Sequence, residues 1–437
     1  MSDKNTLGLS RRRVLGGLGA IGVASAGAGL GTSAYFSDTE SFENNMMTAG
    51  ELDLAVNYVV QEDQGSAGSY TINSFTGEVN GNPADQAVTL NGDGTAMSQD
   101  LDDVKPGDSG HSYFCFTIDD NPAYMWMCGE LTASSENGYT EPEPEDDNGE
   151  GELEEAIEAT MSYCEIDETT GEMVGDLGEE IFSGTLAELL DQLHGGIPLD
   201  GSGDASAMPP DQEPFDGTGD DEVDNSCICI DWEVPTTVGN EIQGDSLKFD
   251  LSFHAIQSRH NDGGHNPCLE GETGDNFAKF RSDFDPSVNA RGRFGDNDPG
   301  TTTGLRELDI RDASDAAEAK GGHSWTSGDS QSFEVSYDGT NVMLDVAGDT
   351  LSTSAVGPSD DDAAITVGAG GGTVEVENVE VNGQTPSGAS SVSANGGTAH
   401  LFLAGGGLSA GDSITGDVTF TWSGSPSQEG LKFRVDS

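Results

Sequence analysis

The sequence predicts an all-β protein made of two antiparallel β-sandwich domains, and three observations support this. Apolar and polar residues alternate over many short stretches, turn residues separate these stretches, and helical periodicity is convincing only once. A length of 437 residues is typical of two or three domains. We assign residues 1–34 to a signal peptide, residues 35–262 to the first β-sandwich, and residues 263–437 to the second.

The first 34 residues have the pattern of an export signal. Arg11 and Arg12 form the arginine pair that the twin-arginine (Tat) route requires, and an uncharged stretch follows from Val14 to Ala34. Glycine, alanine and serine dominate this stretch, so its transfer into a bilayer is only weakly favourable. We therefore expect cleavage between Ala34 and Tyr35, and no permanent membrane anchor.

Strands are predicted first where apolar residues recur at every second position. In the first domain these stretches are residues 52–58, 114–118, 157–163 and 247–253. The helix is predicted after Thr185, which forms a capping box with Glu188. Its apolar stripe consists of Leu186, Leu189, Leu190 and Leu193, and Gly195-Gly196 ends it. We expect it to cover the end of the sandwich.

Two acidic stretches of the first domain are predicted to be surface loops. Residues 141–155 hold nine acidic residues and two prolines, and residues 197–225 mix Gly, Pro, Asp and Ser. Calcium is the alternative explanation for so many carboxylates, but neither loop has the ligand spacing of a calcium-binding loop. We therefore predict no cofactor, with Ca²⁺ as the alternative.

The second domain is also predicted from alternation. Phe333, Val335 and Tyr337, the turn Asp338-Gly339, and then Val342, Leu344 and Val346 predict a β-hairpin. Further strands are expected at residues 365–367, 374–376, 379–381, 401–403 and 414–422, separated by glycine runs. The stretch from Phe333 to Leu351 resembles the central hairpin of concanavalin-type jelly rolls of the laminin-G sort, and this resemblance implies glycan binding.

The charge of the chain excludes several partners. It carries 80 acidic and 16 basic residues, a net charge of −64, which disfavours binding to nucleic acid and to anionic membranes. Disorder is one explanation of such a charge, but the alternating apolar residues argue against it. The other explanation is adaptation to molar salt, where screening suppresses repulsion between surface charges. We expect a salt-adapted protein.

Six cysteines form an even set in a chain that is expected to be exported, which predicts disulfides. They are Cys115, Cys128, Cys164, Cys227, Cys229 and Cys268. Fifteen pairings are possible. Cys227 and Cys229 leave the same face of one strand, opposite the core, so each is expected to bridge to a neighbouring strand. The alternative is a Cys-x-Cys metal site, but no second cysteine pair has zinc-ligand spacing.

Six segments of the first domain, spread over residues 34 to about 262, form a recognisable set. They are Ala34-Tyr35-Phe36-Ser37-Asp38-Thr39, Thr48 to Leu54, Val104 to Asp108, Asp120 to Met127, Gly239 to Ser246 and Arg259-His260-Asn261. Together they resemble the TasA/camelysin family of secreted fibre proteins, in the version found in salt-loving archaea. Ser258 departs from the pattern, because a cysteine is expected before Arg-His-Asn, and Cys268 is the candidate substitute.

The resemblance implies a jelly roll whose N-terminal arm, freed by signal cleavage, adds a strand to the next subunit. Open sheet edges present unpaired backbone groups that such a strand can complete. The apolar side chains of the arm are Tyr35, Phe36, Phe42, Met46 and Met47. The alternative is an arm that folds back onto its own domain as a first strand.

An enzyme is the least favoured class. The family also carries a metalloprotease label, but none of the seven histidines lies in a His-Glu-x-x-His motif. His260 and His265, with Asp262 between them, come closest to a ligand cluster, and a glycine-rich loop explains them equally well. No Gly-x-Ser-x-Gly motif stands out either.

We therefore predict a secreted structural or adhesive protein of the cell surface or extracellular matrix. Its expected partners are copies of itself and extracellular polysaccharide. The alternative is a soluble, monomeric glycan-binding protein.

Overall fold

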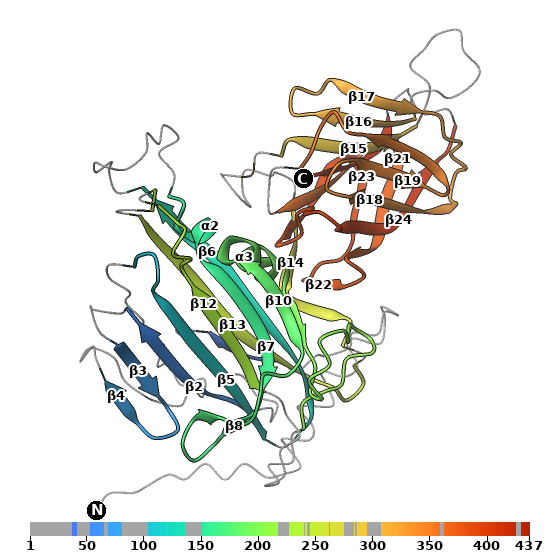
Figure 1. Ribbon diagram of the computed structural model, residues 1–437. Helices are drawn as coiled ribbons and strands as arrows, with labels where there is room; N and C mark the ends of the chain where they lie inside the picture. The colour runs from blue at the N-terminus through green and yellow to red at the C-terminus, as the bar shows by residue number, and fades with distance from the viewer. Residues whose placement is uncertain are drawn as a thin grey trace, which may run out of the picture. The chain divides into compact units, whose positions relative to one another are not determined.

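The computed structural model of the chain is drawn in Figure 1. It describes residues 37–41, 53–64, 69–80, 104–119, 121–136, 151–216, 227–239, 241–242, 245–261, 263–274, 284, 286–294, 307–358, 362–424 and 430–437. Strands dominate these residues, and the prediction of an all-β fold with antiparallel sheets is confirmed. In the described part, no helix is long and apolar enough to cross a bilayer.

Two sheets enclose the first core. The four-stranded sheet has the order β1 (Ser37–Ser41), β13 (Ser246–Gln257), β6 (Ala123–Ser135) and β11 (Ile197–Leu199). The seven-stranded sheet has the order β10 (Glu180–Thr185), β7 (Glu158–Cys164), β12 (Cys227–Glu233), β5 (Ser109–Asp119), β2 (Asp53–Asp63), β3 (Ser69–Asn73) and β4 (Glu78–Asn80). A separate hairpin joins β8 (Ile166–Asp167) to β9 (Glu172–Met173).

The alternation of apolar residues turns one face of each sheet toward this core. On β2, Leu54, Val56 and Tyr58 are fully buried. Phe253 of β13 contacts Phe114 and Phe116 of β5, with ring centroids 5.2 Å and 4.9 Å apart. The two sheets therefore pack face to face through aromatic side chains, as in a β-sandwich.

The helix prediction is confirmed. Helix α3 (Leu186–Gly195) begins after Thr185, whose side chain accepts a hydrogen bond from the Glu188 amide while the Glu188 side chain accepts one from the Thr185 amide. Its four leucines are buried in the first core. A second, short helix, α2 (Leu153–Ala156), begins near the end of residues 141–155, which were expected to be an acidic loop and of which 141–150 lie outside the described residues.

The prediction of a surface loop over residues 197–225 is also wrong in part. Residues 197–199 form strand β11, and Phe215 is fully buried and pairs with Ala123 as an isolated bridge. The Asp200 carboxylate stabilises this region by accepting hydrogen bonds from the amides of Ser202 and Glu213. Buried apolar anchors order the segment despite its loop-like composition.

One twelve-stranded sheet encloses the second core. It contains β14 (His265–Gly274), β15 (Val288–Arg293), β16 (Leu308–Asp312), β17 (Ala317–Gly321), β18 (Ser330–Tyr337), β19 (Val342–Val346), β20 (Asp349–Thr353), β21 (Ala363–Val381), β22 (Thr385–Gly388), β23 (Val392–Ala404), β24 (Ser413–Trp422) and β25 (Leu431–Asp436). Its end strands β17 and β20 contact each other, so the sheet curls into a nearly closed barrel. Strand β14 pairs antiparallel with β23 and parallel with β22.

The predicted hairpin is confirmed, because β18 and β19 pair antiparallel with Phe333 opposite Val346. The three short strands expected between residues 365 and 381 are instead one strand, β21, with bulges between Ala369 and Thr373 and between Glu377 and Glu380. The glycine run lies inside this strand. A Cβ atom on Gly372 would lie 2.2 Å from the Thr421 carbonyl oxygen of β24, so glycine permits the close approach of the two strands.

Candidate functional site

The edge of the four-stranded sheet is the candidate site for assembly. Strand β1 pairs antiparallel with β13 of its own chain, with Ser37 opposite Ile256, Thr39 opposite His254 and Ser41 opposite Ser252. Residues 37–41 therefore form a first strand of their own domain, which was the alternative expectation for the arm. The apolar arm residues Tyr35, Phe36, Phe42, Met46 and Met47 lie outside the described residues, as do Ala34 and the Arg11-Arg12 pair.

Only half of the β13 edge is covered by β1. Strand β13 pairs with β6 along its whole length, whereas β1 covers residues 252–256 only. Among the described strands, none pairs with residues 246–251 on that side. This uncovered half contains Lys248 and a bulge between Lys248 and Phe249. Edge lysines and bulges are two devices that prevent unwanted strand addition, so the half that β1 occupies is the better place for an incoming strand.

His254 lies at this ladder and is largely buried. Burial lowers the pKa of His254 to about 4, so its imidazole is neutral at neutral pH. The imidazole Nε2 lies 3.2 Å from the hydroxyl oxygen of Ser252. The ladder that joins β1 to the sheet therefore contains a histidine whose protonation would destabilise the folded state.

All six cysteines form disulfides, as predicted. Cys227 of β12 bridges to Cys115 of β5, and Cys229 of β12 bridges to Cys164 of β7. Both thiols thus reach neighbouring strands on either side, and the metal-site alternative is wrong because disulfide sulfurs are not thiolate ligands. These four cysteines are buried together with Ile166 in a small cluster of their own.

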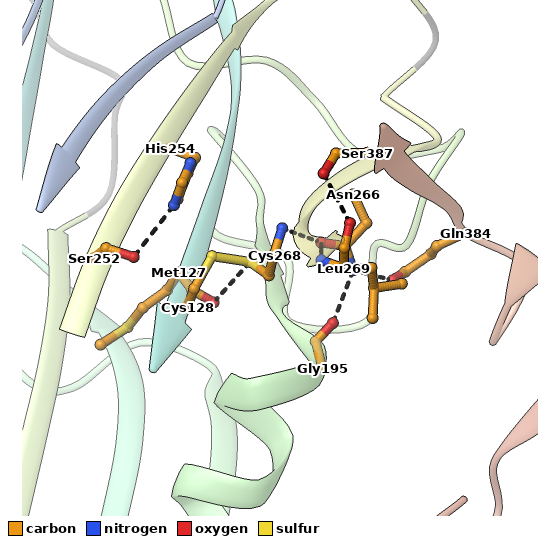
Figure 2. Close-up of a disulfide and its surroundings, with 10 residues drawn as sticks. All are labelled: Met127, Cys128, Gly195, Ser252, His254, Asn266, Cys268, Leu269, Gln384 and Ser387. Atoms are coloured by element: carbon orange, nitrogen blue, oxygen red, sulfur yellow. Dashed lines mark hydrogen bonds between the residues drawn. A yellow bond between two sulfur atoms is a disulfide. The ribbon is translucent and has the colours of Figure 1, made fainter. Parts of the chain in front are cut away.

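The third disulfide links the sheets of the two cores (Figure 2). Cys128 of β6 bridges to Cys268 of β14, so Cys268 completes the set where the family pattern expects a cysteine at position 258. The Ser258 hydroxyl instead donates a hydrogen bond to the Pro122 carbonyl oxygen at 3.0 Å. A Cβ atom on Gly196 would lie 2.6 Å from the Cys268 sulfur, so the glycine that ends α3 also makes room for this bridge.

Asn266 fixes the backbone beside this disulfide. Its side chain is fully buried, and its amide nitrogen donates hydrogen bonds to the Gly195 carbonyl oxygen at 2.8 Å and to Gln384 Oε1 at 2.6 Å. Its side-chain oxygen accepts a hydrogen bond from the Cys268 amide at 2.8 Å, as Figure 2 shows. The side chain therefore ties the end of α3, strand β14 and the start of β22 together.

Three carboxylates from distant parts of the chain converge near the start of α2. Glu136, Glu152 and Asp245 place one oxygen each within 4.8 Å of the others. The Glu152 amide also donates a hydrogen bond to Asp245 Oδ2 at 2.7 Å. Oxygen donors of this kind suit a hard cation such as Ca²⁺. The sequence did not predict this cluster, because only Glu152 belongs to the acidic stretch that was considered.

The histidines do not form such a cluster in the described part of the chain. The carboxylate trio is the only group of three ligand-type side chains brought together there, and neither His260 nor His265 belongs to it. His260 lies in a turn with a positive φ of 66°, and His265 begins β14 opposite Thr385.

The described residues define the class of protein as an all-β chain with two cores and three disulfides. Among models of protein families none matches this sequence, and no curated protein matches it either. The likeness to the TasA/camelysin family therefore rests on the sequence segments given above.

Proposed function

We propose that this protein is a secreted structural or adhesive component of the cell surface or extracellular matrix whose copies join by exchange of strand β1. The observation that carries the proposal is the five-residue ladder between β1 and residues 252–256 of β13. Strand β1 is the first described strand, and among the described strands it pairs with β13 alone. It can leave this edge without breaking any other strand pair described.

Exchange would reproduce in the next copy the backbone hydrogen bonds that β1 makes in its own. Residues 42–52 connect β1 to β2, and a chain of that length spans at most about 40 Å when extended. Each copy would then donate one strand and accept another, and a head-to-tail contact that does not close generates a filament. Signal cleavage beside β1 would give assembly a natural start outside the cell.

Two further features support an extracellular setting. Three disulfides are typical of proteins from oxidising compartments. A net charge of −64 fits surroundings of molar salt, where copies of so acidic a chain can approach one another.

The register offers a direct experiment. Ser41 lies opposite Ser252, so serine-to-cysteine changes at these two positions are nearly isosteric and place two thiols within bridging range. We would mix the processed Ser41→Cys variant with the Ser252→Cys variant in molar salt, oxidise the mixture, and analyse it on a non-reducing gel. Strand exchange predicts covalent dimers that contain one copy of each variant, together with filaments in electron micrographs of the unmodified protein.

The matched control mixes Ser37→Cys with Ser252→Cys. Ser37 lies opposite Ile256, four residues along the strand from Ser252, which is too far for a disulfide. Mixed dimers that form equally well in both mixtures would refute exchange in this register. If no mixed dimer forms and the particles remain monodisperse, β1 stays in its own chain and the proposal fails.

The second candidate is a soluble, monomeric glycan-binding protein, and a groove on the second sheet favours it. The groove has a volume of about 460 Å³ and lies over β14, β21 and β23. Its polar lining consists of Thr273, Glu375, Glu377, Ser391, Ser393 and His400. Hydroxyl, carboxylate and imidazole groups of this kind can hydrogen-bond sugar hydroxyls. Binding of a neutral oligosaccharide by monodisperse protein would support this candidate over assembly.

A further inference from the structure

Basic side chains gather on one outer face of the twelve-stranded sheet. This basic face consists of Arg291, Arg293, Arg311, Lys320, Lys432 and Arg434. The neighbouring residues Ala290, Ile310, Phe433 and Val435 point into the core, so the basic residues that alternate with them point outward. Elsewhere in the described part of the chain, the only basic residues are Lys105, Lys248 and Arg259. We propose that the basic face binds a linear acidic polysaccharide.

The strand register places several of these residues in one straight row across four strands. Lys320 of β17 is opposite Asp309 of β16, Asp309 is opposite Arg291 of β15, and Arg291 is opposite Arg434 of β25. Adjacent strands are about 4.8 Å apart, so the row is about 14 Å long. Beside it, Arg293 lies opposite Lys432.

Two of these cross-strand pairs, Arg291 with Arg434 and Arg293 with Lys432, bring like charges together. Like charges directly opposite each other destabilise a sheet, and a bound anion between them would offset that cost. Such pairs are unexpected by chance in a chain with 16 basic and 80 acidic residues. These like-charged pairs therefore indicate that the basic face binds an anion.

Four carboxylates, those of Asp309, Asp315, Glu318 and Asp436, lie beside the six basic side chains and balance only part of their charge. Asp309 is fully buried and pairs with three guanidinium groups, those of Arg291, Arg293 at 3.4 Å and Arg311 at 3.1 Å. Asp436 pairs with Arg434 at 2.8 Å, and the exposed Asp315 pairs with Arg311 at 3.4 Å. Lys320 and Lys432 are both exposed, and no ion pair joins either to another described residue. These two lysines flank the arginines and are available to a ligand.

The elongated arrangement of the basic side chains favours a polymeric ligand over a small anion. A small anion would need a single basic pair, whereas the exposed Lys320 and Lys432 lie three strands apart, about 14 Å, and can contact acidic groups on successive sugars of one linear chain. In molar salt the screening length is about 3 Å, so the net charge of the protein no longer repels a polyanion and direct contacts decide binding. The inference uses the extracellular location from the proposed function, and it does not depend on strand exchange.

The test measures binding of the processed protein to alginate and dextran sulfate, which carry carboxylate and sulfate groups, with neutral dextran as reference. Titration calorimetry would be done in about 1 M salt, where only short-range contacts persist. We expect binding to at least one acidic polymer and none to dextran. The double variant Lys320→Glu/Lys432→Glu should weaken binding by roughly tenfold or more, because two attractive contacts become repulsive.

The control is Lys105→Glu/Arg259→Glu, which changes the net charge equally at positions outside the twelve-stranded sheet. Its affinity should equal that of the unmodified protein. An equal loss in both variants, or no binding to either acidic polymer, would overturn the proposal. Free glucuronate that binds as tightly as alginate would reveal a small-anion site instead. Self-association lost only in the Lys320/Lys432 variant, without polymer binding, would identify a second copy as the occupant. Covalent dimers from the Ser41→Cys and Ser252→Cys mixture test strand exchange separately.

Discussion

Thr39 of β1 lies directly opposite His254 of β13, in the ladder that closes the edge of the four-stranded sheet. His254 is also opposite Trp126 of β6, which is fully buried. The histidine is thus held between an exchangeable edge strand and a strand anchored in the sheet. Its charge state couples the solvent pH to the stability of this edge.

Acid should destabilise the protein through His254. Burial lowers its folded pKa to about 4, below the ordinary value of 6.5, so the unfolded chain binds the proton more tightly. This contribution to stability is complete above pH 6.5 and is lost as the pH falls toward 4, by roughly 3 kcal/mol. Urea unfolding at constant salt should show a flatter pH profile for His254→Gln than for the unmodified protein. His111→Gln is the control, because its pKa is raised by the hydrogen bond to Asp231 and its loss should not flatten the profile. Equal profiles for His254→Gln and the unmodified protein would contradict this role.

The Cys128–Cys268 disulfide should couple the two cores. Its cysteines are 140 residues apart, and removing a bridge over so long a loop costs about 2–5 kcal/mol. We expect Cys128→Ala/Cys268→Ala to separate one unfolding transition into two when calorimetry is done in molar salt. Cys164→Ala/Cys229→Ala, with a separation of 65 residues inside one sheet, should lower stability without separating the transitions. One undivided transition in the first variant would show that the hydrogen bonds of Asn266 suffice for coupling.

Asp309 should be indispensable to the second core. Replacing it with asparagine leaves three largely buried guanidinium groups without their shared carboxylate, which costs about 3–5 kcal/mol. Asp315→Asn is the matched control, because Asp315 also pairs with Arg311 but is 64% exposed, and its loss should cost less than about 1 kcal/mol. Denaturation curves of the two variants measure the difference. Similar midpoints would mean that the arginines find other partners once Asp309 is neutral.

Dilution into low salt should unfold the protein. At about 10 mM salt the screening length rises to about 30 Å. The excess carboxylates of a chain with a net charge of −64 then repel one another over the whole molecule. Far-ultraviolet circular dichroism during stepwise dilution would follow the loss of strands. Sucrose at matched osmolality should restore the fold less than salt does, since it stabilises by exclusion from the surface but does not screen charge. A chain that keeps its strand signal at low salt would contradict salt adaptation.

The sequence by itself determined the local elements. The alternation in β2 and β5 gave the strands and their buried faces, and Thr185 with Glu188 gave the start of α3, because period and capping are properties of neighbouring residues. The position of Cys227 and Cys229 on one strand also predicted that each would bridge to a neighbour. Their partners, Cys115 and Cys164, followed only once β12 was placed between β5 and β7.

Tertiary structure decided everything that depends on long-range neighbours. It brought Glu136 and Asp245 to Glu152, placed Arg291 opposite Arg434, and set Ser37–Ser41 beside β13 of the same chain. It also joined the short strands expected between residues 365 and 381 into one, because the glycines between them, such as Gly368 and Gly372, also pair with β25 and β24. Sheet pairing joins residues far apart in sequence, and no local pattern encodes which strand becomes the neighbour of another.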